Sequence, residues 1–165
     1  MNQSSITYSG NSFLIWGYST VFVSLLVFVC LKLTGNEIYY CFYVGVPILA
    51  NLIIRLTQKD YSRSDTEILV NKVWALFGGL TLLLYVGRYY CIFALFAIVS
   101  SLMGIETIVT AIIIKCKIVA LFGIVGILGA IPLLLVSGHE QNLIIAIVFI
   151  FISVIPGYVI NYKTT

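Results

Sequence analysis

Charged residues are scarce in this chain, which excludes most classes of soluble protein. Asp, Glu, Lys and Arg make up 9% of the 165 residues, hydrophobic residues make up 61%, and the mean hydropathy is +1.12. An average soluble domain carries roughly 25% charged residues. The composition therefore indicates an integral membrane protein along almost the whole chain.

The residue types that carry enzyme and cofactor chemistry are also sparse. The chain has one histidine, His139, so a nucleophilic relay has no second histidine, and no HExxH, GxSxG or phosphate-binding glycine motif occurs. His139 and Glu140 share the turn SGHEQN, where a metal-binding or pH-sensing role is the alternative to a plain turn. We interpret them as turn residues, and we predict a protein that is not an enzyme and that has no cofactor and no metal.

Basic residues are absent from the N-terminal segment MNQSSITYSGNS and form no dense cluster elsewhere. A cleaved signal peptide needs a positively charged start, so we expect the first apolar block to be retained as a span. Nucleic-acid binding needs a basic patch, so we expect no nucleic-acid partner.

The cysteines lack the spacing of a redox or zinc motif. We interpret all four as small buried hydrophobic residues, with a Cys41–Cys91 disulfide as the alternative. They are Cys30, Cys41, Cys91 and Cys116.

Six apolar blocks are each long enough to cross a bilayer core about 30 Å thick, which takes about 20 helical residues. Backbone amides in hydrocarbon must be hydrogen-bonded within their own segment, so these blocks are expected to be helices. The sequence thus predicts an all-α fold, a polytopic transmembrane bundle of six helices in a single domain of residues 1–165. The predicted spans are residues 13–33, 38–55, 68–87, 89–114, 118–136 and 143–162.

The third span has a recognisable start. Ser64-Asp65-Thr66-Glu67 has the form of a capping box, in which the Ser hydroxyl and the Glu carboxylate bond the free N–H groups of the first turn. Asp65 and Glu67 also suit the positive end of the helix dipole.

Loop charges predict the orientation. Most basic residues fall on the side that the two termini share, namely Arg55, Lys59, Arg63, Lys72, Lys115, Lys117 and Lys163. Only Lys32 and Arg88 fall on the other side. Basic residues are enriched in cytoplasmic loops, so both termini are expected to be cytoplasmic.

Small residues at helical spacing predict how the helices pack, because helices in lipid associate through close contact and hydrogen bonds. On the fourth span, Ser100, Gly104, Thr107 and Ala111 form one stripe. Three pairs repeat this pattern on other spans: Ala75 and Gly79, Gly126 and Ala130, and Ser153 and Gly157. Prolines interrupt three spans, at Pro47, Pro132 and Pro156, and each is expected to bend its helix.

Glu106 lies deep inside a predicted span. It precedes Lys115 by nine residues, which is about 13.5 Å at the rise of an α-helix and places it near the middle of the membrane. A charge there costs on the order of 3 kcal/mol. We therefore expect the carboxyl group to face the bundle and to find a hydrogen-bond partner, with Thr110 as a candidate. Two roles would explain the residue. The carboxyl group could be protonated and form a hydrogen bond with a neighbouring helix, or it could belong to an ion- or proton-binding site.

Two stretches of the sequence resemble a known family. SFLIWGYSTVFVSL in the first span and IPGYVINYK near the end resemble a family of small uncharacterised polytopic inner-membrane proteins from bacteria of the Bacteroides group. The resemblance implies a bacterial inner membrane and no particular mechanism.

These observations favour a non-enzymatic integral membrane protein that acts through helix-mediated contact with itself or a membrane partner. The expected partners are the lipid bilayer and a second copy or another membrane protein. The alternative is a small transporter or channel subunit that uses Glu106 near the membrane midplane. A dry helix contact around Glu106 would favour the first function, and a polar cavity from Glu106 to either membrane face would favour the second.

Overall fold

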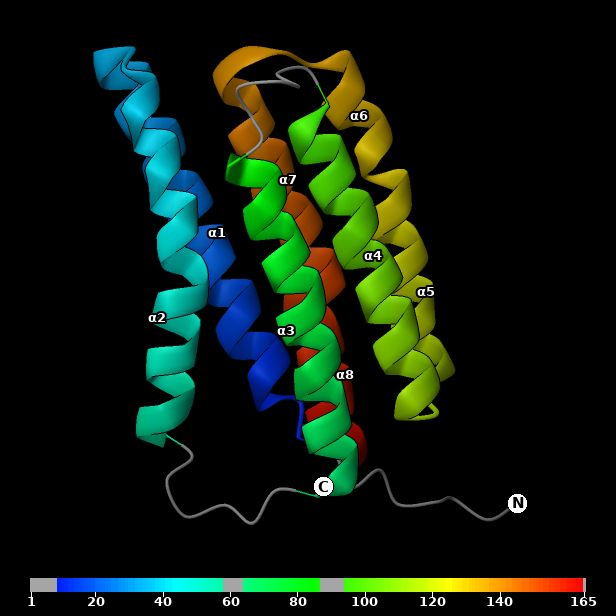
Figure 1. Cartoon of the computed structure of the whole chain (residues 1–165). Helices are drawn as coiled ribbons and strands as arrows, with labels where there is room; N and C mark the ends of the chain where they lie inside the picture. The colour runs from blue at the N-terminus through cyan, green and yellow to red at the C-terminus, as the bar shows by residue number, and fades with distance from the viewer. Residues whose placement is uncertain (1–8, 58–63, 87–93, 165) are drawn as a thin grey trace.

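Six long apolar helices dominate the computed structural model, which describes residues 9–57, 64–86 and 94–164 (Figure 1). No strand occurs in these three stretches. Each of the six helices is long and apolar enough to cross a membrane. The predicted all-α fold of a multi-pass membrane protein is therefore confirmed.

The first two spans run in opposite directions, side by side (Figure 1). The first is α1 (Asn11–Thr34), and the second joins a 3₁₀ turn, η1 (Glu37–Cys41), to α2 (Phe42–Thr57). Helix α1 ends at Gly35, whose backbone is left-handed with a φ of 65° and whose N–H donates to the Leu31 carbonyl at 2.8 Å. Glycine adopts this conformation without a steric cost, so it is a common helix terminator.

The third span, α3 (Asp65–Val86), starts at the predicted capping box. Ser64 Oγ accepts the backbone N–H of Glu67 at 3.3 Å, and Asp65 and Glu67 both lie in the first turn. The predicted end of this span at residue 87 and the predicted start of the next at residue 89 lie outside the described residues.

The fourth and fifth spans form an antiparallel pair. Helix α4 (Leu95–Ile113) is followed by α5 (Lys117–Leu128), which continues as α6 (Ala130–Leu135). The fifth span is interrupted at residue 129, between α5 and α6. Pro132 explains the interruption, because it has no N–H to donate to the carbonyl four residues earlier, at the end of α5.

The sixth span is built from consecutive helical segments. After a 3₁₀ turn, η3 (Gly138–Glu140), α7 (Gln141–Phe149) runs through a π-helical turn, η4 (Ile150–Val154), into α8 (Ile155–Thr164). The wider turn ends two residues before Pro156, whose ring and missing N–H disrupt the α-helical pattern of the preceding residues.

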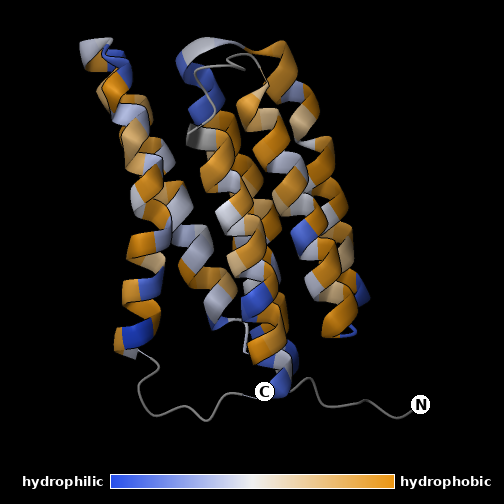
Figure 2. Ribbon diagram, in the orientation of Figure 1, coloured by the Kyte–Doolittle hydropathy of each residue, from blue (hydrophilic) through white to orange (hydrophobic). Residues whose placement is uncertain are grey.

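The helices pack unequally. The contact between α4 and α5 is the most extensive, α1 packs on α2 and α7, and α3 packs mainly on α4. One apolar cluster is centred on Val27, Leu133 and Ile152, and a second on Phe13 and Val70. Hydrophobic residues cover the middle of the bundle, and hydrophilic residues gather toward its ends (Figure 2).

Both described chain ends lie at the same end of the bundle (Figure 1), where the Gly10 N–H donates to Asn161 Oδ1 at 2.8 Å. The basic residues Arg55, Lys72, Lys115, Lys117 and Lys163 belong to helix ends or turns on this side, and Lys32 belongs to the opposite one. Lys59, Arg63 and Arg88 lie outside the described residues. The cytoplasmic placement of the termini stays a prediction.

Candidate functional site

Glu106 lies inside the bundle, but its carboxyl group has no hydrogen-bond partner in the described part of the chain. The side chain is 1% exposed, and both carboxyl oxygens lack a partner there. Met103 and Thr110, one turn before and after it, contact Thr81 and Trp74 of α3. Because residues three and four apart share a helix face, the face of α4 that carries Glu106 is turned toward α3.

The prediction that Glu106 forms a hydrogen bond with Thr110 is wrong, because neither carboxyl oxygen of Glu106 has a partner among the described residues. Thr110 Oγ1 instead accepts the indole N–H of Trp74 at 3.3 Å. An indole N–H can only donate, so a buried Trp needs an acceptor, and Thr110 is itself fully buried. Buried polar groups nearly always have partners, which leaves Glu106 as an exception that requires a reason.

Small residues form a close backbone contact between α4 and α5. A Cβ added at Gly104 would lie 2.6 Å from the Gly123 carbonyl oxygen and 2.7 Å from the Ile127 nitrogen. A Cβ added at Gly126 would lie 3.0 Å from Gly104 Cα, and Ser100 Oγ donates to the Gly126 carbonyl at 2.7 Å. The predicted packing through Ser100, Gly104 and Gly126 thus agrees with the structure, in which the two helices approach so closely that only glycine fits at positions 104 and 126.

Thr107 and Ala130 have other surroundings. Thr107 Oγ1 donates to the Met103 carbonyl of its own helix at 2.8 Å and lies 3.4 Å from the Ile152 carbonyl of η4. Pro156 has no N–H to donate to this Ile152 carbonyl, and the Thr107 hydroxyl can turn to it as an alternative to the nearer Met103 carbonyl. Ala130 begins α6 and belongs to the apolar core.

The small residues of α3 do not pack inside the bundle, which corrects the sequence prediction. Ala75 and Gly79 are exposed, and a Cβ added at Gly79 would meet no heavy atom within 4 Å. In the most apolar 18-residue stretch of α3, 17% of the residues are buried, whereas the share in the corresponding stretch of α4 is 50%. The prediction failed because α3 contacts α4 through a different face, which carries Trp74 and Thr81.

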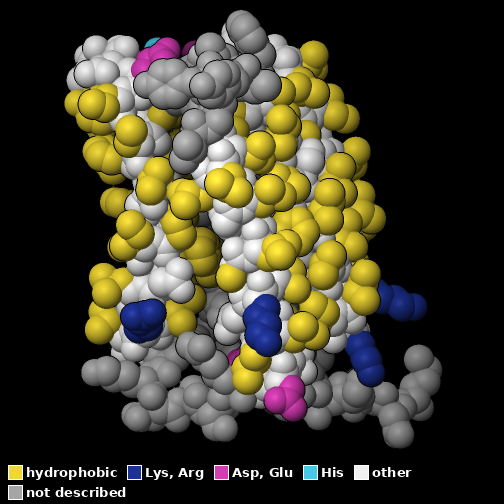
Figure 3. Space-filling view, viewed as in Figure 1, with side chains coloured by type: hydrophobic (Ala, Val, Ile, Leu, Met, Phe, Trp, Pro, Cys, Tyr) yellow, Lys and Arg dark blue, Asp and Glu magenta, His cyan; other side chains and the backbone are white. Residues whose placement is uncertain are grey.

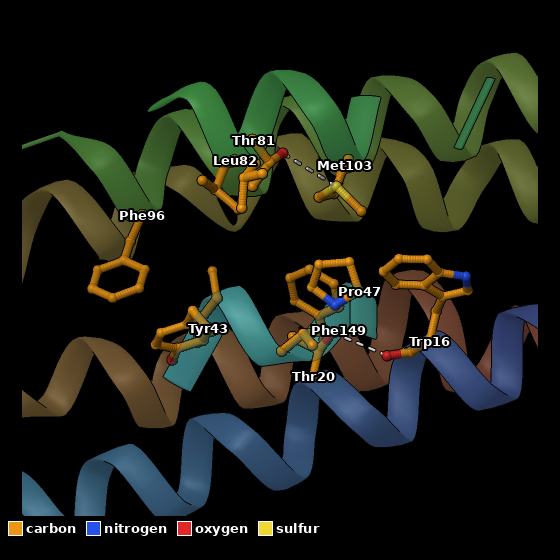
Figure 4. Close-up of a pocket in the computed structure, with 13 residues that line it drawn as sticks. Trp16, Thr20, Tyr43, Pro47, Thr81, Leu82, Phe96, Met103 and Phe149 are labelled. Atoms are coloured by element: carbon orange, nitrogen blue, oxygen red, sulfur yellow. Dashed lines mark hydrogen bonds between the residues drawn. The ribbon is translucent and has the colours of Figure 1, made fainter. Parts of the chain in front are cut away.

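An apolar pocket of about 70 Å³ lies between α1, α2, α3, α4 and α7 (Figure 4). Its walls include Trp16 and Thr20 of α1, Tyr43 and Pro47 of α2, and Gly78 of α3. Glu106 is not among the residues that line it. The pocket therefore provides no polar path to the buried carboxyl group.

Sequence reasoning missed a buried polar cluster at the end of the bundle opposite the termini. The Tyr43 hydroxyl forms hydrogen bonds with Ser24 Oγ at 3.0 Å and Asn142 Oδ1 at 2.8 Å, and Asn142 Nδ2 donates to the His139 carbonyl at 3.0 Å. Ser24 and Asn142 are fully buried. The available signal was an Asn next to the start of an apolar span, because an amide there needs buried partners.

The turn and cysteine predictions have mixed outcomes. His139 lies in η3, and no group of three or more metal-ligand residues occurs within residues 9–57, 64–86 and 94–164. Cys116 is buried, as expected, whereas Cys30 is half-buried and Cys41 is exposed, so the prediction that these two are buried is wrong. Cys41 faces outward because its turn, η1, lies at the edge of the bundle. Cys91, and with it the alternative disulfide, lies outside the described residues.

No protein-family model, curated protein or solved structure matches this chain. The resemblance to the family from the Bacteroides group therefore stays a prediction. The choice between candidate functions rests on the geometry.

Proposed function

We propose that this protein is a non-enzymatic, multi-pass protein of a bacterial inner membrane that acts through helix-mediated contact with itself or a membrane partner. In this proposal α3 provides the contact. One observation carries it: Ala75 and Gly79, four residues apart, are exposed, and space is open around Gly79. Small residues at this spacing let two membrane helices approach closely.

The attachment of α3 supports the same proposal. Helix α3 packs mainly on α4, and the side chains of Leu76 and Leu83 are 67% and 69% exposed. These leucines flank the two small residues and would give an approaching helix apolar side chains to pack against. A helix with one main neighbour and an open small-residue face can take a second neighbour without rearranging the bundle.

Photo-crosslinking in native membranes tests this proposal. A photoreactive amino acid at Leu76 of α3 should give a discrete adduct, whereas the same group at Leu121 of α5, which is 60% exposed, should not. An adduct of twice the mass identifies a second copy, and another mass identifies a partner. Adding Gly79→Leu should abolish the adduct, because a bulky side chain would fill the approach surface.

Equal crosslinking at Leu76 and Leu121 would contradict the proposal, since it would reflect random encounters in the bilayer. An adduct that survives Gly79→Leu would also contradict it. The variant protein itself should remain folded, because the added side chain meets open space.

A transporter or channel subunit is the second candidate function, and one observation favours it. Glu106 is a buried acid without a hydrogen-bond partner among the described residues, and acids inside membranes often bind ions or protons. Against it, the pocket next to α4 is apolar and excludes Glu106 from its lining. Proton or ion flux into vesicles that Glu106→Gln abolishes would decide for transport, and the absence of flux in the unchanged protein would decide against it.

A further inference from the structure

We propose that the furrow between α2 and α3 binds an anionic phospholipid, with one acyl chain in the pocket and the headgroup phosphate between Arg55 and Lys72. The site is open to the bilayer from the side. The headgroup end of the site lies at the end of the bundle that holds both termini, and the pocket extends from the middle of the bundle toward Tyr43 at the opposite end.

The furrow exists because α2 and α3 attach to different helices. Helix α2 packs mainly on α1, and α3 mainly on α4. The pocket lies where the two diverge, with Tyr43 and Pro47 of α2 on one side and Gly78 and Leu82 of α3 on the other. Figure 3 shows the hollow between the two helices on the lipid-facing surface.

The lining fits a hydrocarbon chain and offers little to a polar ligand. Thr20 Oγ1 already donates to the Trp16 carbonyl at 3.0 Å, and the Tyr43 hydroxyl is bonded to Ser24 and Asn142. The Thr81 hydroxyl lies 3.9 Å from Met103 Sδ, the other remaining side chains of the lining are aliphatic or aromatic, and Gly78 has open space around its Cβ position. An apolar cavity that opens into hydrocarbon is filled most readily by an acyl chain, because no polar group has to be desolvated.

Basic residues stand on both sides of the furrow at one end. Arg55 lies in the last turn of α2 and Lys72 near the start of α3, and both are exposed. Figure 3 shows basic side chains over these two helices, on either side of the hollow. Neither residue has an ion pair among the described residues. The acids that precede Lys72 on α3 are Glu67, which is buried and about 7.5 Å away along the helix, and Asp65, which is about 10 Å away. Their charge is therefore available to a phosphate.

The spacing along the helices matches a phospholipid. Lys72 is six residues from Gly78, or about 9 Å along α3, and Arg55 is eight residues from Pro47, or about 12 Å along α2. Half of a bilayer core is about 15 Å. The lining residues farther along these helices, Leu82 and Tyr43, are ten and twelve residues from Lys72 and Arg55, or about 15 and 18 Å. The acyl chain of a lipid whose phosphate is held at the two basic residues thus enters the pocket at its near end, beside Gly78 and Pro47.

Fluorescence quenching by brominated lipids tests this site, because Trp16 lines the pocket. The protein is reconstituted in phosphatidylcholine vesicles that contain increasing fractions of either brominated phosphatidylglycerol or brominated phosphatidylcholine. We expect the anionic lipid to quench at about one-tenth the concentration of the neutral one, given the attraction of two basic residues. Equal quenching by the two lipids would overturn the proposal.

Two variants give the test its specificity. Arg55→Gln with Lys72→Gln should abolish the preference for the anionic lipid. The matched control, Lys115→Gln with Lys117→Gln, removes two exposed charges from the same membrane side in the turn between α4 and α5 and should keep it. Equal losses in both pairs would show general surface attraction and would overturn the site.

A third variant addresses the acyl chain. Gly78→Leu fills the pocket from a position where a Cβ meets no atom within 4 Å, so it should reduce quenching by both brominated lipids while the bundle stays folded. Unchanged quenching would mean that no chain enters the pocket. None of these readouts depends on contact between copies, so the lipid site and the proposed function can fail separately.

Discussion

Helices α3 and α4 carry the same kind of small-residue pattern in opposite surroundings. On α4, Gly104 lies so close to α5 that an added Cβ would be 2.6 Å from a backbone oxygen. On α3, an added Cβ at Gly79 would meet nothing within 4 Å. One pattern forms a close contact inside the fold, and the other is exposed on the surface that we propose as the contact with a partner.

The difference shows what a small-residue pattern encodes. Small side chains permit two helices to approach closely, but they do not determine which helix is the neighbour. Helix α4 makes this close contact with α5 of the same chain, and the hydrogen bond from the Ser100 hydroxyl to the Gly126 carbonyl stabilises it. In α3 the corresponding contact is incomplete, and the same helix borders the furrow of the proposed lipid site. We therefore expect the packed side to determine stability and the open side to provide the proposed binding surfaces.

The largest expected effect extends the comparison to α1 and α2. A Cβ at Gly17 of α1 would lie 2.8 Å from Val154 Cγ2 and 3.1 Å from the Val154 nitrogen, whereas a Cβ at Gly45 of α2 would meet nothing within 4 Å. Gly17→Leu should destabilise the protein by about 3 kcal/mol, the upper end for overpacking, because backbone has to move. Gly45→Leu is the control and should leave thermal unfolding in detergent unchanged. Equal unfolding temperatures for the two variants would contradict the account.

A smaller effect is expected on the packed side from Ser100→Ala. The variant leaves the close contact in place but removes the hydrogen bond to the Gly126 carbonyl, which should cost about 0.6–2 kcal/mol in a membrane interior. Ser101→Ala is the matched control, because no hydrogen bond of the Ser101 side chain occurs in the described structure. Denaturation in mixed detergent measures both variants, and an equal loss from Ser101→Ala would show that the bond is not the cause.

The smallest effect is expected at Glu106. Because its carboxyl oxygens have no partner among the described residues, Glu106→Leu removes a buried polar group without breaking a bond, and stability should be unchanged or higher. Thr110→Val, which removes the acceptor of the Trp74 indole, should instead lose about 0.6 kcal/mol or more. If thermal unfolding shows that Glu106→Leu is the more damaging of the two, the carboxyl group has a partner that the account lacks.

Much of the fold could be predicted from the sequence, because the lipid bilayer restricts which backbone structures can cross it. Apolar blocks of membrane length admit only helices, and the six spans follow from hydropathy. The start of α3 followed from Ser64 and Glu67, and the interruptions followed from Pro132 and Pro156, since these residues act on the backbone locally.

The candidate site was less predictable, because it depends on which faces meet. The cost of burying a charge placed Glu106 inside the bundle, but its lack of a partner depends on where the polar groups of the other helices lie, which is set by contacts between distant residues. Ala75 and Gly79 look like the pairs on other helices, and only the arrangement of α3 leaves them exposed. The pocket between α2 and α3 has no sequence signal, because it arises where two helices diverge.

Thermal unfolding of Gly104→Leu and Gly79→Leu, measured in the same detergent, tests the division between the packed and open sides most directly. Both variants replace a helical glycine in a span with the same bulky side chain. We expect a clear fall in the unfolding temperature for Gly104→Leu, from a loss of about 1–3 kcal/mol. For Gly79→Leu we expect an unchanged or slightly raised unfolding temperature, since leucine is the better helix former. Similar falls for both variants, or the larger fall for Gly79→Leu, would contradict this division.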